Sequence, residues 1–165
     1  MVLKVIALTG ATGFVGSSLV HELAEVDKVR CLFRSEAAAE QLRSEGYEAV
    51  MWDMASSVEP VDAVKGCGVL VHCAAQMRGT RREYESVNVR GTRLLVEACK
   101  KAGVKRVVYL SSILADNKYN NDYGNTKRVG EEIIKGSGID YVIFRIGNIC
   151  SSNDKRTFGR LLRAI

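Results

Sequence analysis

A phenol and an ammonium stand four residues apart in this chain, at Tyr123 and Lys127. On a helix, that spacing puts both side chains on one face. A tyrosine with its ordinary pKa of about 10 exchanges protons poorly at neutral pH, but a neighbouring ammonium and an oxidised nicotinamide would favour the phenolate and lower that pKa. The pair could therefore do acid–base chemistry on a hydroxyl or carbonyl oxygen. The same spacing also fits an exposed helix pair with no chemical role.

Three glycines near the start of the chain give that pair a context. Gly10, Gly13 and Gly16 follow the apolar run 2–8, and apolar residues at helical spacing come after them. Gly10 permits a tight turn out of a strand, Gly13 leaves room for a phosphate, and Gly16 permits close packing of a helix whose first N–H groups face an anion. The sequence therefore predicts a loop that binds a dinucleotide. The alternative is a glycine-rich turn without a ligand.

Two residues at the ends of predicted strands bear on the choice of dinucleotide. Arg34 occupies the position where an acidic residue would accept hydrogen bonds from the ribose hydroxyls of NAD. A guanidinium can instead bind a 2′-phosphate, which favours NADP over NAD, and the alternative is a solvated arginine. Asp53 could accept a hydrogen bond from the adenine amino group, or it could cap a turn.

Two serines, Ser111 and Ser112, end the fifth predicted strand. Open α/β sheets bind their ligands at the carboxyl ends of the strands. A hydroxyl at that edge could polarise the same substrate oxygen with which Tyr123 exchanges a proton.

The elements that must position these groups alternate along the chain between apolar strands and amphipathic helices. The predicted strands are 2–8, 28–33, 48–52, 69–73, 105–110 and 140–145; the predicted helices are 14–25, 36–43, a short one after Pro60, 83–101, 123–135 and 157–165. Several strands are continuously apolar, as in a sheet covered on both faces. The fold class is therefore α/β, a doubly wound parallel sheet between two helical layers.

Composition narrows the class of protein further. A chain of 165 residues, 47% of them hydrophobic, fits a single domain over 1–165. The net charge of +5 is spread along the chain and gives no case for nucleic acid. The five cysteines form no C-x-x-C pair, so we expect core cysteines in a reducing compartment, with neither a metal site nor a disulfide framework. With no apolar segment of membrane-spanning length, we expect a cytoplasmic protein without a membrane partner.

The motifs together resemble the short-chain dehydrogenase/reductase superfamily, in the extended or atypical branch that contains NAD(P)-dependent epimerases, dehydratases and reductases. The resemblance is carried by the cofactor loop 9–16, the fourth-strand segment 71–75, the asparagine-bearing helix 87–92, the serine strand 109–112 and the segment 144–149. It implies a Rossmann fold and a catalytic triad of Ser112, Tyr123 and Lys127, in which Lys127 also holds the nicotinamide ribose. It further implies contacts to NADP, or to NAD, from Gly10, Thr12, Gly13, Phe14, Val15, Gly16, Arg34, Asp53, Met54, Cys73, Ala74, Ala75 and Ile149.

The chain also departs from the pattern of that branch. Ile146 replaces a usual proline, and Ser112 lies only eleven residues before Tyr123, which implies a short lid over the substrate. The carboxyl-terminal substrate-binding portion of the extended members is expected to be absent. The resemblance implies a small-molecule substrate and a possible homodimer through the helix 83–101. An alternative is a non-catalytic NADPH-binding protein, such as a redox-sensing regulator or a subunit similar to accessory subunits of complex I.

Overall fold

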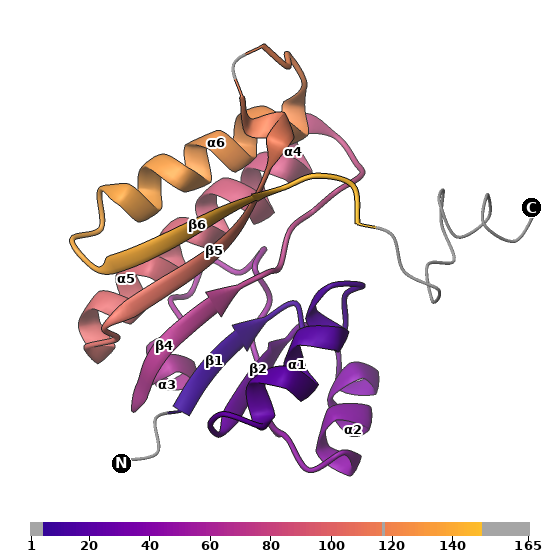
Figure 1. The fold of residues 1–165 in the computed structure, drawn as a ribbon, viewed down its shortest axis with the longest axis vertical. Coiled ribbons are helices and arrows are strands. Elements are labelled where there is room, and N and C mark those ends of the chain that lie inside the picture. Colours follow the sequence, from indigo (N-terminus) through magenta and orange to yellow (C-terminus); the bar gives the residue numbers. More distant parts are fainter. Residues whose placement is uncertain (1–4, 117, 150–165) are drawn as a thin grey trace, which may run out of the picture.

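A computed structural model describes residues 5–116 and 118–149, arranged as one six-stranded sheet with helices on both faces (Figure 1). The strands are β1 (Val5–Thr9), β2 (Val29–Phe33), β3 (Glu48–Met51), β4 (Cys67–His72), β5 (Arg106–Ser112) and β6 (Asp140–Ile146). The helices are α1 (Gly16–Ala24), α2 (Glu36–Ser44), α3 (Val61–Val64), α4 (Arg81–Tyr84), α5 (Thr92–Ala102) and α6 (Asp122–Lys135). The π-helical segment η1 (Glu85–Gly91) joins α4 to α5, and the 3₁₀ turn η2 (Ile113–Ala115) follows β5.

The sheet confirms the predicted doubly wound architecture. Its strand order is β3-β2-β1-β4-β5-β6, and every pairing is parallel. Strand order reverses between β1 and β4, and ligands of open α/β sheets bind at such a switch point. The carboxyl ends of the strands that carry the predicted site residues therefore lie at one edge.

Two apolar clusters hold the helices against the sheet. One is built around Leu8, Val20, Cys31 and Val71 on the side of α1 and α2, and the other around Leu70, Leu95, Val107 and Ile134 on the side of α5 and α6. Figure 1 shows α5 and α6 behind the sheet, and α1 and α2 in front of it. The burial of Cys31, Cys67 and Cys99 confirms their predicted place in the core; Cys150 lies outside the described residues.

The predicted helix 83–101 is the element that differs most from expectation. The structure divides it into α4, the wider η1 and α5. A capping box between Thr80 and Glu83 starts α4. Gly91, at the end of η1, lies against the backbone oxygen of Met54, so closely that a Cβ at this position would collide with it. The predicted helix 157–165 lies outside the described residues.

Within the described ranges, none of the helices combines the length and the apolar composition that a membrane span requires.

Candidate active site

The glycine loop folds tightly onto the segment that follows β4. Gly10 has φ +77, a left-handed conformation that favours glycine, and a Cβ there would lie 2.8 Å from the Ala74 nitrogen. A Cβ at Gly16 would collide with the Gly10 oxygen, so Gly16 lets α1 begin against the loop itself. A Cβ at Gly13 would meet only one atom, the Gly10 oxygen at 3.1 Å. The remaining side of Gly13 is open, as a bound phosphate requires.

The start of α1 suits an anion. Its N-cap residue, Val15, makes no side-chain capping bond, and no acidic residue occupies the first turn. Amide groups and a helix dipole at such an end attract a phosphate. Thr12, Phe14 and Val15 belong to this loop, as predicted. Cys73, Ala74 and Ala75 line the neighbouring segment after β4, where each is partly buried.

Arg34 lies just beyond β2 and is exposed. Within the described residues it makes no ion pair, whereas Arg30 on the same strand pairs with Glu48 at 2.7 Å. Its guanidinium is therefore available to a phosphate, although the solvated alternative fits the same geometry.

Asp53 and Met54 take local roles in the chain. The carboxylate of Asp53 accepts a hydrogen bond from the Ala55 nitrogen at 2.8 Å, which is the turn-capping alternative. Met54 is buried and packs against Gly91. Ile149, the last described residue, is 39% exposed. Contacts of these three residues with a dinucleotide stay predictions.

The two serines of β5 have different partners. The buried Ser111 hydroxyl donates to Glu131 on α6 at 2.6 Å. The Ser112 hydroxyl oxygen accepts a long bond from the Leu114 nitrogen at 3.2 Å, and among the described residues its proton has no recorded acceptor. The role of Ser112 in a triad stays a prediction.

Tyr123 lies in the first turn of α6, close to the turn that follows Ser112. Asn121 caps the helix by accepting a bond from the Gly124 nitrogen at 2.7 Å. Gly124 packs so tightly against the Leu114 oxygen that a Cβ would collide with it. The start of α6 therefore sits directly against η2, which begins one residue after Ser112.

Lys127, one helical turn further on, is almost completely buried. Its ammonium lies 4.0 Å from the centroid of the Tyr109 ring, and within the described residues it forms no ion pair. Burial lowers the pKa of Lys127 to about 7, against the opposing effects of Cys73 and Glu131. A buried ammonium without a carboxylate partner is suited to receive hydroxyl groups of a ligand.

The ammonium of Lys127 alone does not lower the pKa of Tyr123 in this structure. Burial raises the pKa of this phenol, and the neighbouring Tyr84 raises it further. The two rings lie 6.3 Å apart, whereas the Lys127 ammonium rests on the ring of Tyr109 instead. In this structure, desolvation outweighs the predicted effect of the ammonium on the phenol.

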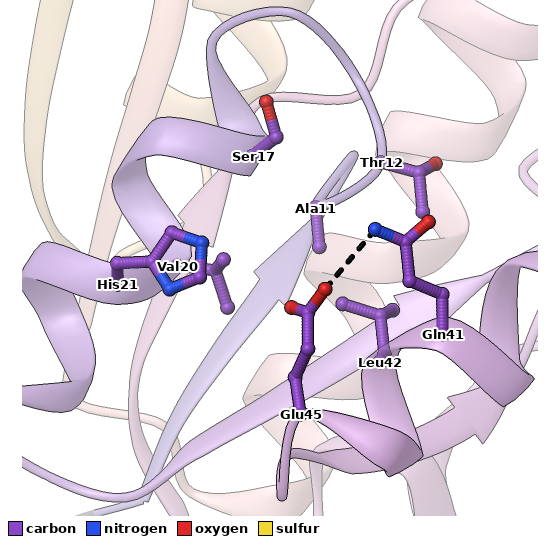
Figure 2. Close-up of a pocket in the computed structure, with 8 residues that line it drawn as sticks. All are labelled: Ala11, Thr12, Ser17, Val20, His21, Gln41, Leu42 and Glu45. Atoms are coloured by element: carbon purple, nitrogen blue, oxygen red, sulfur yellow. Dashed lines mark hydrogen bonds between the residues drawn. The ribbon is translucent and has the colours of Figure 1, made fainter.

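A small hollow lies on the other side of the glycine loop, between α1 and α2 (Figure 2). Its volume is about 110 Å³, and its lining includes Thr12, His21 and the hydrogen-bonded pair Gln41 and Glu45. Ligand pockets are usually several times larger, so this hollow cannot enclose a dinucleotide. It contains no member of the predicted triad.

Sequence reasoning named the helix of Asn88 but not the contacts of that residue. The side-chain amide of Asn88 accepts a hydrogen bond from the backbone nitrogen of Gln76 at 2.7 Å and donates one to the backbone oxygen of Gln76 at 3.0 Å. It also donates to the Thr126 hydroxyl at 3.1 Å. Asn88 thus ties the segment after β4 to α6, between Tyr123 and Lys127.

A second missed contact is the ion pair of Glu131 with Arg145. Two hydrogen bonds, at 2.9 and 2.7 Å, join the buried carboxylate on α6 to the guanidinium on β6. No spacing of residues in the sequence predicts this ion pair. A glutamate on the apolar face of a predicted helix is the signal that could have pointed to it.

Comparisons with known proteins agree with this geometry. Residues 10–163 match a family model described as NAD(P)H-binding. A ceramide reductase from Caulobacter vibrioides is 31% identical over 157 residues, which cover 94% of this chain and 49% of that protein. An uncharacterized sugar epimerase, YhfK, from Bacillus subtilis is 29% identical over 153 residues, covering 86% of this chain and 71% of that protein.

A solved structure extends the comparison to three dimensions. It is a short-chain dehydrogenase/reductase superfamily protein from Agrobacterium tumefaciens with bound NAD. The two chains are 28% identical with a TM-score of 0.71, over 86% of this chain and 48% of the other. The chain thus spans about half the length of the ceramide reductase and of this solved protein.

The fold and the glycine loop define an NAD(P)-binding Rossmann protein. The chain belongs to the NAD(P)H-binding family and to the short-chain dehydrogenase/reductase superfamily, and one of its relatives is named as a sugar epimerase.

Proposed function

We propose that this protein is an NAD(P)-dependent oxidoreductase that transfers a hydride between the nicotinamide and a hydroxyl- or carbonyl-bearing carbon. The observation that carries the proposal is the buried ammonium of Lys127, which forms no ion pair within residues 5–116 and 118–149. It lies one helical turn from Tyr123 on a helix that abuts the turn after Ser112. Relatives named as reductases and epimerases support the same reaction class.

The residues would divide the work as follows. When bound, the dinucleotide supplies the carbon that accepts or donates the hydride. Tyr123 exchanges a proton with the substrate oxygen, and the Ser112 hydroxyl donates a hydrogen bond that steadies developing charge on that oxygen. Lys127 holds the nicotinamide ribose, and its charge favours the phenolate of Tyr123. The glycine loop holds the linked phosphates, and Arg34 selects NADP through its 2′-phosphate.

A non-catalytic NADPH-binding protein is the second candidate, and one observation favours it. Burial and Tyr84 raise the pKa of Tyr123, so a smaller fraction of this phenol is ionised at neutral pH than an activated tyrosine would have. A protein that uses the bound dinucleotide for signalling or assembly would not need an activated tyrosine.

Turnover separates the two functions. The test follows the absorbance of reduced nicotinamide while the protein is mixed with NADPH and a panel of ketones, aldehydes and sugar nucleotides. An enzyme shows substrate-dependent oxidation of NADPH, which Tyr123→Phe lowers at least about 100-fold. The matched control is Tyr141→Phe on β6, an exposed tyrosine outside the site, which leaves the rate unchanged. Tight NADPH binding without turnover, unaffected by Tyr123→Phe, supports the second candidate.

A further inference from the structure

A row of side chains crosses the middle of the sheet on the face beneath α5 and α6. Thr9 on β1, His72 on β4 and Tyr109 on β5 are register partners on adjacent strands. His72 is completely buried in this row, and its ring lies 5.2 Å from that of Tyr109. The proposed chemistry assigns no role to His72, although a buried imidazole needs partners for both ring nitrogens.

Only one placement of hydrogens satisfies the bonds around this imidazole. The Thr92 hydroxyl donates to the Asn88 backbone oxygen at 2.7 Å, so it accepts from Nε2 of His72 at 3.0 Å. Nδ1 of His72 therefore accepts from the Thr9 hydroxyl at 2.7 Å. The Thr9 oxygen in turn accepts from the Ala74 nitrogen at 3.2 Å.

The imidazole is neutral and held in a single tautomer. Burial, with a smaller effect of the nearby charge of Lys127, lowers the pKa of His72 to about 3. Every hydrogen bond in this series donates in the same direction, from the Ala74 N–H to the Asn88 backbone oxygen. Reversing one bond would leave a buried donor or acceptor unpaired, which costs about 1–3 kcal/mol.

The series of hydrogen bonds ends at the dinucleotide loop on one side and near α6 on the other. At one end, Thr9 immediately precedes Gly10 of the dinucleotide loop. At the other end is Asn88, whose side chain donates to the Thr126 hydroxyl, and that hydroxyl donates to the backbone carbonyl oxygen of Tyr123 at 2.8 Å. His72 is the link that joins them.

We propose that His72 is a positioning residue that couples the glycine loop to α6 through Thr9 and Thr92. This inference rests on the proposed function, because the coupling joins the dinucleotide site to the triad. It predicts that Thr9 and Thr92, whose hydroxyls both bond to the ring of His72, affect dinucleotide binding together rather than independently.

A double-mutant cycle tests the coupling. The dissociation constant of NADPH is measured by nicotinamide fluorescence for the wild type, Thr9→Val, Thr92→Val and the double variant. We expect each single variant to weaken binding about fivefold, as for the loss of one hydrogen bond. We expect the fold-change of the double variant to differ from the product of the single fold-changes by at least about threefold.

Control variants separate coupling from simple loss of stability. Thr92→Ser keeps the hydroxyl and is expected to retain wild-type affinity. Ser137→Ala removes a buried hydroxyl that accepts from the Ile139 nitrogen, far from this chain of bonds, and its effect is expected to multiply with that of Thr9→Val. If Thr92→Val does not fold, Thr92→Ala takes its place in the cycle.

The outcomes distinguish this inference from the proposed function. If the protein binds NADPH and the double variant changes the dissociation constant by the product of the two single fold-changes, the coupling is overturned. The proposed function is then unaffected. A wild-type chain that binds no NADPH overturns the proposed function, and the coupling with it.

Discussion

Neighbouring residues with the same chemistry have different tasks in this site. The Ser111 hydroxyl donates to Glu131 on α6, whereas the Ser112 hydroxyl, at the edge of the sheet, donates to no group in the part of the chain that the structure describes. The sequence predicted both at a strand end, and the superfamily pattern selected Ser112. It could not predict the environment of Tyr123, because the burial and the neighbouring Tyr84 that raise its pKa depend on the tertiary fold.

The sequence predicts that His72 needs hydrogen-bond partners, but it does not identify them. A histidine inside the apolar run 69–73 had to find partners, because a buried polar group without hydrogen bonds is costly. Its partners are 63 and 20 residues away in the chain, however, and no local pattern identifies them.

Replacing Arg34 tests its proposed role in the choice between NADP and NAD. Arg34→Asp removes a charge-assisted bond to a 2′-phosphate and places an acceptor for ribose hydroxyls, so NADPH affinity should fall roughly 10- to 100-fold while NADH affinity rises. Fluorescence titration with both dinucleotides measures the ratio. Arg93→Asp, an exposed arginine on α5, is the matched control. An unchanged ratio in Arg34→Asp would mean that Arg34 is only a solvated surface residue.

Lys127 carries a prediction about pH. Its pKa falls from 10.5 to about 7 on folding, so between these values the unfolded chain binds more protons than the folded chain. The free energy of unfolding should therefore rise with pH from 7 toward 9, by up to about 1.4 kcal/mol per unit. Urea unfolding of the dinucleotide-free chain measures this slope.

Lys127→Met is the comparison that assigns the slope to this residue. Raised thiol pKa values of Cys31 and Cys99 act in the opposite direction near and above pH 9, but they are present in both proteins. The pKa of Cys73 depends on Lys127, so the comparison is made below pH 9. The free energy of unfolding of the wild type minus that of Lys127→Met should therefore increase as the pH rises from 7 toward 9. Equal slopes in the two proteins would show that the ammonium is not desolvated.

Among the elements, α6 is the one on which the site depends most. It carries Tyr123 and Lys127, and Glu131 fixes it to both β5 and β6. The predicted helix 123–135 differs from α6 by one residue at its start, and Gly136 is the signal that marked its end. The π-helical η1 was not predicted. Its last residue, Gly91, lies against Met54, which is distant in sequence, and no local pattern shows this contact.

Glu131→Gln tests the attachment of α6. The change leaves the Arg145 guanidinium without its charged partner, but Arg145 is 45% exposed and water can solvate it. We expect a loss of about 1–3 kcal/mol in the free energy of unfolding, below the full cost of breaking a buried pair. Urea unfolding measures this loss.

The adjacent glutamate provides the matched control for that experiment. Glu132 is 65% exposed and pairs with Lys135 on the surface, so Glu132→Gln should cost less than about 0.5 kcal/mol. Equal losses in the two variants would show that the buried pair contributes no more than a surface pair.

In the whole molecule, the two faces of the sheet are covered unequally. The helices α1 and α2 lie over β1, β2 and β3, whereas α5 and α6 cover the opposite face near β4 and β5 (Figure 1). On the α1 side of the edge strand β6, Val142 and Phe144 are 40% and 53% exposed. The alternation of apolar segments predicted the layers, but it could not show which half of a face stays open.

Two neighbouring residues of β6 test this asymmetry. Phe144→Ser should lower the free energy of unfolding by less than about 1 kcal/mol, because its ring remains largely in water. Ile143→Ser, which alters the side that packs against the core, should cost about 2 kcal/mol or more. Urea unfolding measures both, and a larger loss for Phe144→Ser would show that this face is covered in solution.

The central claim is that the glycine loop aims a nicotinamide ring at Tyr123, and a crystal structure of the NADP⁺ complex measures it most directly. If a substrate carbon must lie about 3–3.5 Å from the nicotinamide and its oxygen within a hydrogen bond of the phenol, C4 of the ring should lie within about 6 Å of the Tyr123 hydroxyl. The Lys127 ammonium should also contact the nicotinamide ribose. A nicotinamide bound well beyond that distance, or phosphates held away from Gly13, would contradict the account.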